Sequence, residues 1–99
     1  MSLHGAKLIE DGDATGPWVE WAGGSGTFAV VAGTWNGATV KLQLLGPDGS
    51  TALDVTDASF TADGYVNFEL GVGKIRAFVS GSPANVFALV SYSAMFAYP

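Results

Sequence analysis

Residues 38–79 decide the fold class of this chain, and they read ATVKLQLLGPDGSTALDVTDASFTADGYVNFELGVGKIRAFV. Apolar and polar residues alternate along three runs in this stretch, 40–44, 65–70 and 74–79. The apolar members are Val40, Leu42, Leu44, Val66, Phe68, Leu70, Ile75, Ala77 and Val79. Because successive side chains of a β-strand point to opposite faces, a period of two predicts strands that each bury one face.

Turn signals separate these runs and recur along the chain. Residues 46–49, Gly-Pro-Asp-Gly, fit a type I turn, because proline fixes φ at the second position and glycine closes the turn. Asn36-Gly37 is a strong signal for a tight turn between two strands. A spacing of roughly 8–12 residues between turns is typical of sandwiches and barrels. We therefore predict an all-β protein, a single antiparallel β-sandwich or jelly-roll-like barrel of about 7–8 short strands.

Two of the expected strands carry apolar residues on both sides. In the first, 27–32, the expected inward residues are Phe28, Val30 and Ala32, and the outward residues are Ala29 and Val31. In the last, 86–92, the inward set is either Phe87 and Leu89 or Val86, Ala88 and Val90, and the sequence leaves both open. A strand that is apolar on both sides is expected to be central or covered.

The 99 residues are enough for one domain with a single modest core. We divide the chain into an N-terminal arm, 1–16, a β-sandwich domain, 17–93, and a C-terminal tail, 94–99. The arm has one short apolar run before a series of glycine and aspartate breakers, so it has room for one short strand but is not expected to belong to the core. The tail is apolar yet lies beyond the last expected strand, so it either packs on its own domain or docks on a neighbour.

Charge is sparse: charged residues make up 13% of the chain, about half the usual share of roughly 25%. The net charge is −5, and the four cations are scattered. Such a chain cannot neutralise a row of phosphates, so we expect neither a nucleic-acid nor a membrane partner. The chain has no cysteine, which excludes disulfides and thiolate metal sites. Low charge instead suggests a surface partly covered by a neighbour, although a weakly charged monomer is the simpler alternative.

Catalytic patterns are missing from the sequence. The single histidine, His4, lies in the expected arm, so it has no obvious serine to activate. The acidic residues lie mostly at turns or on outward faces, and 71–74, Gly-Val-Gly-Lys, lacks the remaining residues of a phosphate-binding loop. We therefore expect no enzyme, no cofactor and no metal site.

Two kinds of surface site are conceivable. Apolar residues on outward faces or in the two terminal segments are candidates for a protein interface, namely Leu8, Ile9, Val31, Phe78, Met95, Phe96 and Tyr98. Alternatively, aromatic side chains on a β-sandwich can stack on sugar rings, and the candidates are Trp18, Trp35 and Tyr65.

Four short motifs follow one another in the chain. They are a Gly-Thr-Trp run at 33–35, a Leu-Gly-Pro-Asp-Gly turn at 45–49, a Phe-Thr-x-Asp-Gly turn at 60–64 and a Gly-Lys-x-Arg strand at 73–76. With these motifs, residues 26–92 resemble a group of small β-sandwich proteins of tailed bacteriophages, which are encoded among the head and tail structural genes. The chain departs from that pattern in lacking a proline just before the glycine of the last motif.

The resemblance implies a non-enzymatic virion structural protein, for example a capsid decoration or cement protein or a head-fibre component. It implies assembly in the host cytoplasm into the virion, as a homo-oligomer such as a trimer, next to other virion proteins such as the major capsid protein. The alternative that the aromatic residues leave open is a carbohydrate-binding β-sandwich module.

Overall fold

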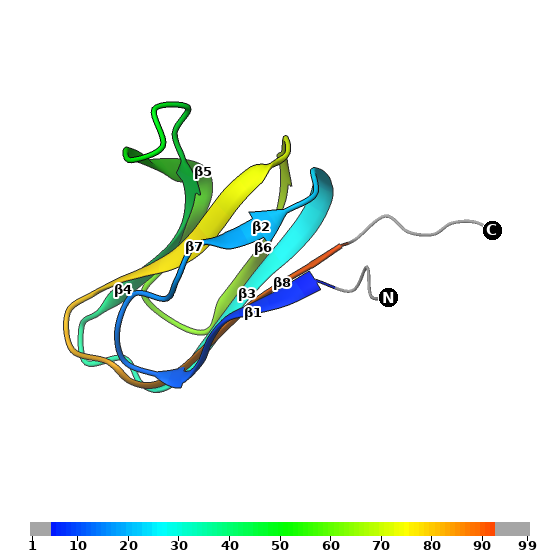
Figure 1. Cartoon of the computed structure of the whole chain (residues 1–99). Helices are drawn as coiled ribbons and strands as arrows, with labels where there is room; N and C mark the ends of the chain where they lie inside the picture. The colour runs from blue at the N-terminus through cyan, green and yellow to red at the C-terminus, as the bar shows by residue number, and fades with distance from the viewer. Residues whose placement is uncertain (1–4, 93–99) are drawn as a thin grey trace.

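The computed structural model describes residues 5–92, which form eight strands and no helix, hence no helix able to cross a membrane. The strands are β1 (Gly5–Gly12), β2 (Val19–Trp21), β3 (Gly24–Thr34), β4 (Thr39–Leu45), β5 (Ala52–Phe60), β6 (Gly64–Leu70), β7 (Gly73–Ser80) and β8 (Ala84–Tyr92). They form two antiparallel sheets, sheet A in the order β1-β8-β3-β6 and sheet B in the order β2-β7-β4-β5 (Figure 1). The expected all-β sandwich is therefore confirmed.

The core lies between the two sheets and is built from the inward residues of both. It includes Phe28, Val30, Val40, Leu42, Ile75, Ala77, Val86 and Val90, all fully buried. The alternation expected for β3, β4, β6 and β7 is thus confirmed, because the inward residues of these strands belong to this core or pack against it.

Trp21 fills one end of the core. Its ring stacks on that of Tyr92, with 4.1 Å between the centroids, and is tilted against Phe68 at 5.1 Å. A Cβ atom at Gly26 would lie 2.7 Å from Cη2 of Trp21 and 2.9 Å from Cζ of Phe68. Only a glycine at this point of β3 leaves room for the indole ring.

The pairing of β3 with β8 settles which residues of β8 face inward. Val86, Ala88 and Val90 are buried, whereas Phe87 and Leu89 are exposed. The inward residues of β8 lie opposite the inward residues of β3 in the register Phe28–Val90, Val30–Ala88 and Ala32–Val86. The smaller side chains of β8 therefore pack in the core, and its two largest apolar side chains point to solvent.

Two turns have the geometry that the sequence predicts. Gly49 donates a backbone hydrogen bond to the carbonyl of Gly46 at 3.0 Å, which closes the turn between β4 and β5. The carboxylate of Asp48 accepts hydrogen bonds from Thr51 and from the backbone of Ser50, which hold it in the turn. The same hydrogen bonds lower the pKa of Asp48 to about 2. The turn between β3 and β4 is closed by a hydrogen bond from the backbone N–H of Ala38 to the carbonyl of Trp35 at 2.8 Å, and Asn36 and Gly37 both have positive φ, 50° and 75°. It is a tight turn but not a hairpin, because β3 belongs to sheet A and β4 to sheet B.

The prediction that residues 1–16 form an arm is wrong for the described part. Strand β1 pairs along β8 as the edge of sheet A, and Leu8 and Ile9 are only 2% and 7% exposed. The register between the two strands shifts between Lys7 and Ile9. Such a β-bulge inserts an extra residue, which lets two consecutive apolar side chains face the core. Leu8 and Ile9 are therefore core residues, not interface residues.

The chain after β1 is also attached to the sandwich, along the edge of sheet B. The hydroxyl of Thr15 accepts a hydrogen bond from the backbone N–H of Val79 at 2.9 Å, and Gly16 donates to the carbonyl of Ala77 at 3.1 Å. The β-sandwich thus already includes Gly5–Gly12, well before residue 17. The expected tail, with Met95, Phe96 and Tyr98, and His4 lie outside the described residues.

We predict that Leu8→Ala lowers the free energy of unfolding by about 2–5 kcal/mol, the cost of deleting a buried leucine side chain. The matched control is Val72→Ala, because Val72 is 82% exposed in the β6–β7 turn. The control should change the free energy of unfolding by less than about 0.5 kcal/mol. Denaturant unfolding measures both. Equal small effects would contradict the placement of Leu8 in the core.

Candidate interaction surfaces

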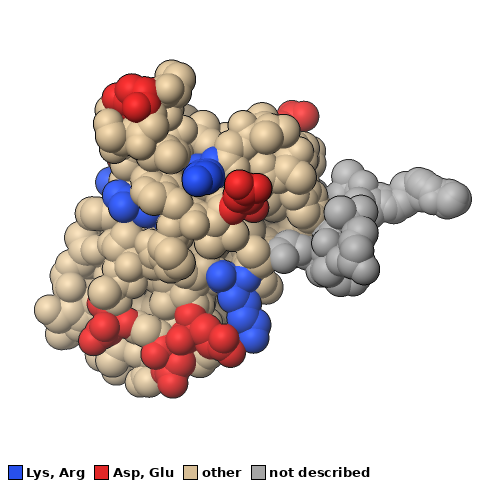
Figure 2. All heavy atoms as spheres, viewed as in Figure 1, with Lys and Arg blue, Asp and Glu red and all other residues tan. Residues whose placement is uncertain are grey.

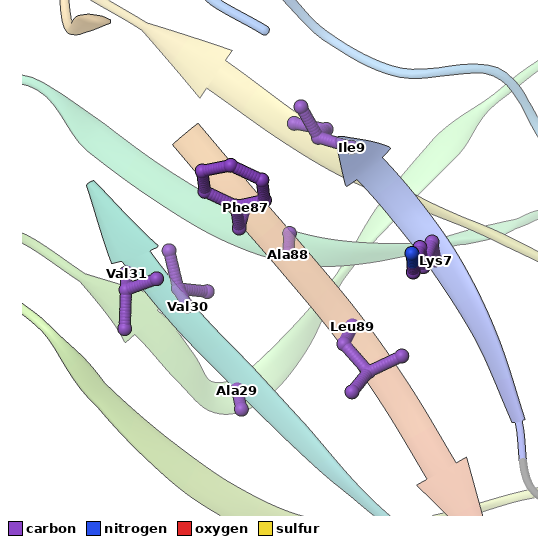
Figure 3. A pocket seen from close by; sticks show the side chains of 8 residues that line it. All are labelled: Lys7, Ile9, Ala29, Val30, Val31, Phe87, Ala88 and Leu89. Atoms are coloured by element: carbon purple, nitrogen blue, oxygen red, sulfur yellow. The ribbon is translucent and has the colours of Figure 1, made fainter. Parts of the chain in front are cut away.

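The outer face of sheet A carries an apolar patch on its two central strands. We define the sheet A patch as Ala29 and Val31 of β3 with Phe87 and Leu89 of β8. Val31, Phe87 and Leu89 are 49%, 44% and 42% exposed, and they surround a shallow pocket of about 260 Å³ (Figure 3). The strand register holds these side chains together, since Val31 pairs with Phe87 and Ala29 with Leu89.

Polar side chains border the sheet A patch on the two edge strands. On β1, Lys7 lies opposite Leu89 and forms an exposed ion pair with Glu10 at 3.0 Å. On the other side, β6 presents the phenol of the exposed Tyr65 opposite Ala29, and Asn67 accepts a hydrogen bond from the hydroxyl of Thr27 at 2.8 Å. An apolar centre with a polar border is the usual anatomy of a protein–protein contact, and single scattered apolar residues would not produce it.

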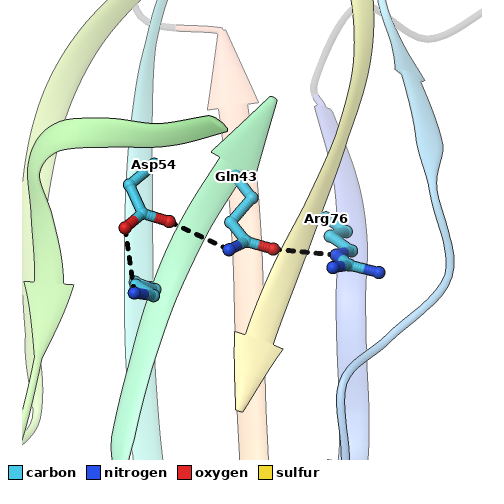
Figure 4. Close-up of polar contacts among 4 residues, drawn as sticks. Gln43, Asp54 and Arg76 are labelled. Carbon is cyan, nitrogen blue, oxygen red and sulfur yellow. Dashed lines mark hydrogen bonds and ion pairs between the residues drawn. The ribbon is translucent and has the colours of Figure 1, made fainter. Parts of the chain in front are cut away.

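The outer face of sheet B is polar and ordered by a chain of hydrogen bonds. Asp54 of β5 accepts a hydrogen bond from the side-chain amide of Gln43 at 2.9 Å and pairs with Lys41 at 3.0 Å. The carbonyl of the same amide accepts a hydrogen bond from Nε of Arg76 at 2.9 Å (Figure 4). Gln43 is only 6% exposed, so its amide is held in one orientation between the carboxylate and the guanidinium.

This chain of contacts alters the acidity of Asp54. The hydrogen bond from Gln43, and then that from Lys41, lower the pKa of the carboxyl below its ordinary value. Both bonds stabilise the ionised form, and the side chain stays exposed enough for burial to oppose them only weakly.

Aromatic side chains pack against the cations of the same face. The guanidinium carbon of Arg76 lies 4.4 Å from the ring centroid of Trp18 and 5.9 Å from that of Phe78. The ammonium of Lys41 lies 5.3 Å from the Phe78 ring. Phe78, which the sequence marks as an interface candidate, is half-buried and packs with two cations of its own sheet.

The three aromatic residues suggested for sugar stacking lie on different parts of the molecule. Trp18 packs on sheet B, whereas Tyr65 is exposed on the outer face of sheet A. Trp35, between β3 and β4, donates a hydrogen bond from its indole nitrogen to Asp63 at 2.8 Å and packs against the core. The structure does not bring them together into one stacking platform.

Asp63 holds both the Trp35 side chain and the end of β3. The same carboxylate oxygen accepts a hydrogen bond from the backbone N–H of Ala32 at 3.0 Å. The hydrogen bonds from Trp35 and Ala32 lower the pKa of Asp63, in that order of importance. Asp63 therefore stabilises the structure at the end of β3. Within residues 5–92, no three histidine, cysteine or acidic side chains are grouped so that they could hold a metal ion.

No protein-family model, curated protein or solved structure matches this chain. The resemblance to phage virion proteins thus stays a prediction from the sequence.

We predict that Gln43→Leu raises the pKa of Asp54 toward the ordinary value of about 3.9, because the amide donor is lost. Carbon-detected NMR of the carboxyl groups across a pH series measures it, and Asp48 is the control whose pKa should not change. A carboxyl with a lowered pKa contributes stability above its ordinary pKa, and this is lost as the pH falls through the pKa of the folded state. As the pH falls below about 4, the ordinary pKa of an aspartate, the native protein should therefore lose more stability than Gln43→Leu. Parallel pH profiles would contradict the role of Gln43.

Proposed function

We propose that this protein is a non-enzymatic structural subunit that acts by associating with further copies of itself through the sheet A patch. The observation that supports it is the exposure of Val31, Phe87 and Leu89 side by side on the two central strands. A sheet face that is apolar at its centre loses unfavourable contact with water when it is covered.

The sheet A patch lets a second copy of the chain dock in spite of the net charge. Two copies each carry a net charge of −5 and repel each other, so a stable contact needs a region free of acidic groups. The four residues of the sheet A patch are uncharged. Charge is sparse elsewhere too, since charged side chains cover only a minor part of the face seen in Figure 2. Two such sheets can stack at about 10 Å, as the two sheets of a sandwich do.

The position of the sheet A patch on the two central strands suits a two-fold axis parallel to the strands. Such an axis places β1 of one copy over β6 of the other, because these strands are the opposite edges of sheet A. The two patches, on the central strands β3 and β8, then meet at the centre of the contact. This pairing produces dimers or other even-numbered assemblies, whereas a trimer needs a different, head-to-tail contact.

The setting we propose for this assembly is the particle of a tailed bacteriophage, as the resemblance of residues 26–92 implies. A decoration or head-fibre subunit needs no catalytic group. It stabilises a shell because binding to the assembled form, and not to the dissociated form, shifts the equilibrium toward assembly. Other virion proteins, such as the major capsid protein, are then its further partners.

We predict that the native protein forms oligomers whose fraction rises with concentration, and that the triple variant Val31→Thr, Phe87→Thr, Leu89→Thr is monomeric. Threonine keeps the preference for strands while making the face polar. Light scattering after size exclusion, across a concentration series, measures the mass, and unfolding curves establish that the variant is folded.

The matched control is Val72→Thr, which makes the same kind of change at an exposed position outside the patch and should leave the mass unchanged. A native protein that is monomeric at every concentration would overturn self-association through the patch. The same would follow from a triple variant that is folded and still oligomeric.

A further inference from the structure

We propose that the outer face of sheet B binds a carboxylate, supplied by an aspartate or glutamate side chain of a neighbouring protein, at the guanidinium of Arg76. This site lies on the opposite sheet from the sheet A patch and does not depend on it. It would give the subunit a second contact surface, with a different chemistry.

The first step of the argument is that Arg76 is held in place from behind. Its Nε donates to the carbonyl of Gln43 at 2.9 Å, and the amide group of Gln43 is in turn fixed by Asp54 at 2.9 Å. Because Gln43 is buried and bonded at both ends, the guanidinium cannot turn without breaking this chain. An arginine fixed in this way loses little conformational freedom when it binds a ligand.

The second step is that aromatic rings fix the plane of the guanidinium. The Trp18 ring lies within 4.4 Å of it, and Phe78 lies on the same outer face of β7 at 5.9 Å. Stacking on an aromatic face leaves the edge of the guanidinium available for hydrogen bonds. Figure 4 shows one terminal nitrogen of Arg76 pointing away from Gln43.

The third step is that the charge of Arg76 is not neutralised within the protein. Between residues 5 and 92 the ion pairs are Lys7–Glu10 and Lys41–Asp54, and Arg76 belongs to neither. Both carboxylate oxygens of Asp54 are used, one by Lys41 and the other by Gln43. Gln43 thus separates Asp54 from Arg76, which keeps the guanidinium available to an external carboxylate.

The surroundings favour a protein carboxylate over a phosphate or a sugar. Asp54 and Glu20 both lie on sheet B, so a dianionic phosphate meets more repulsion there than a singly charged carboxylate. A sugar ring would have to compete with Arg76 for the face of Trp18 that the guanidinium already covers. A planar carboxylate fits the two terminal nitrogens of an arginine and forms short, charge-assisted hydrogen bonds with them.

The test is an NMR titration in the background of the triple variant Val31→Thr, Phe87→Thr, Leu89→Thr, which removes the proposed self-association. The ligand is a blocked tripeptide with one central aspartate, and the control ligand has asparagine instead. The resonances followed are Nε–H of Arg76 and the indole N–H of Trp18. We expect saturable shifts of both with the aspartate peptide and none with the asparagine peptide.

The variants separate charge from geometry. Arg76→Gln should abolish the shifts, and Arg76→Lys, which keeps the charge without the planar fork, should weaken binding about tenfold. Lys74→Gln is the matched control, since Lys74 lies on the same strand opposite Glu20, and it should bind as the native sequence does.

Three results would overturn the carboxylate site: no saturable shift with the aspartate peptide, equal binding by Arg76→Gln, or tighter binding of inorganic phosphate than of the peptide. Because the titration uses the variant without the sheet A patch, its failure would not count against the proposed self-association. Likewise, a failure of self-association would not count against the carboxylate site.

Discussion

The antiparallel pairing of β3 with β8 is the constraint on which both the core and the sheet A patch depend. One register places Phe28 opposite Val90 inside the sandwich and Val31 opposite Phe87 outside it. A shift by a single residue would exchange the two faces of a strand, because side chains alternate with a period of two. The same pairing therefore determines the buried residues of sheet A and its exposed apolar surface, and neither can change alone.

Much of the fold could be predicted because β4, β6 and β7 alternate regularly and end at strong turn signals. The sequence did not reveal that β1 belongs to the core. The adjacent pair Leu8-Ile9 breaks the period of two, and the bulge that buries both depends on the partner strand β8. For β8 the pattern was ambiguous. Both faces are apolar, and only the packing against Phe28 and Val30 selects the smaller side chains for the core.

The candidate surfaces were only partly visible in the sequence. Val31 was expected to face outward and does, but its neighbours Phe87 and Leu89 come from a strand more than 50 residues later whose facing was open. The chain from Asp54 through Gln43 to Arg76 joins three strands, β5, β4 and β7. Nothing in the local pattern marks such a chain, because each member alone looks like an ordinary polar residue on an outward face.

Cysteine labelling tests most directly which face of β8 is buried, on which the register with β3 and the sheet A patch depend, because the native chain has no cysteine. Single variants at positions 86 to 90, each with one cysteine, would be exposed to a thiol reagent in dilute solution, and a small buried cysteine is tolerated in a core. Fast reaction of Phe87→Cys and Leu89→Cys, with protection of Val86→Cys, Ala88→Cys and Val90→Cys, is the predicted result. Protection at 87 and 89 in dilute solution with fast reaction at 86, 88 and 90 would contradict the register, and with it the sheet A patch.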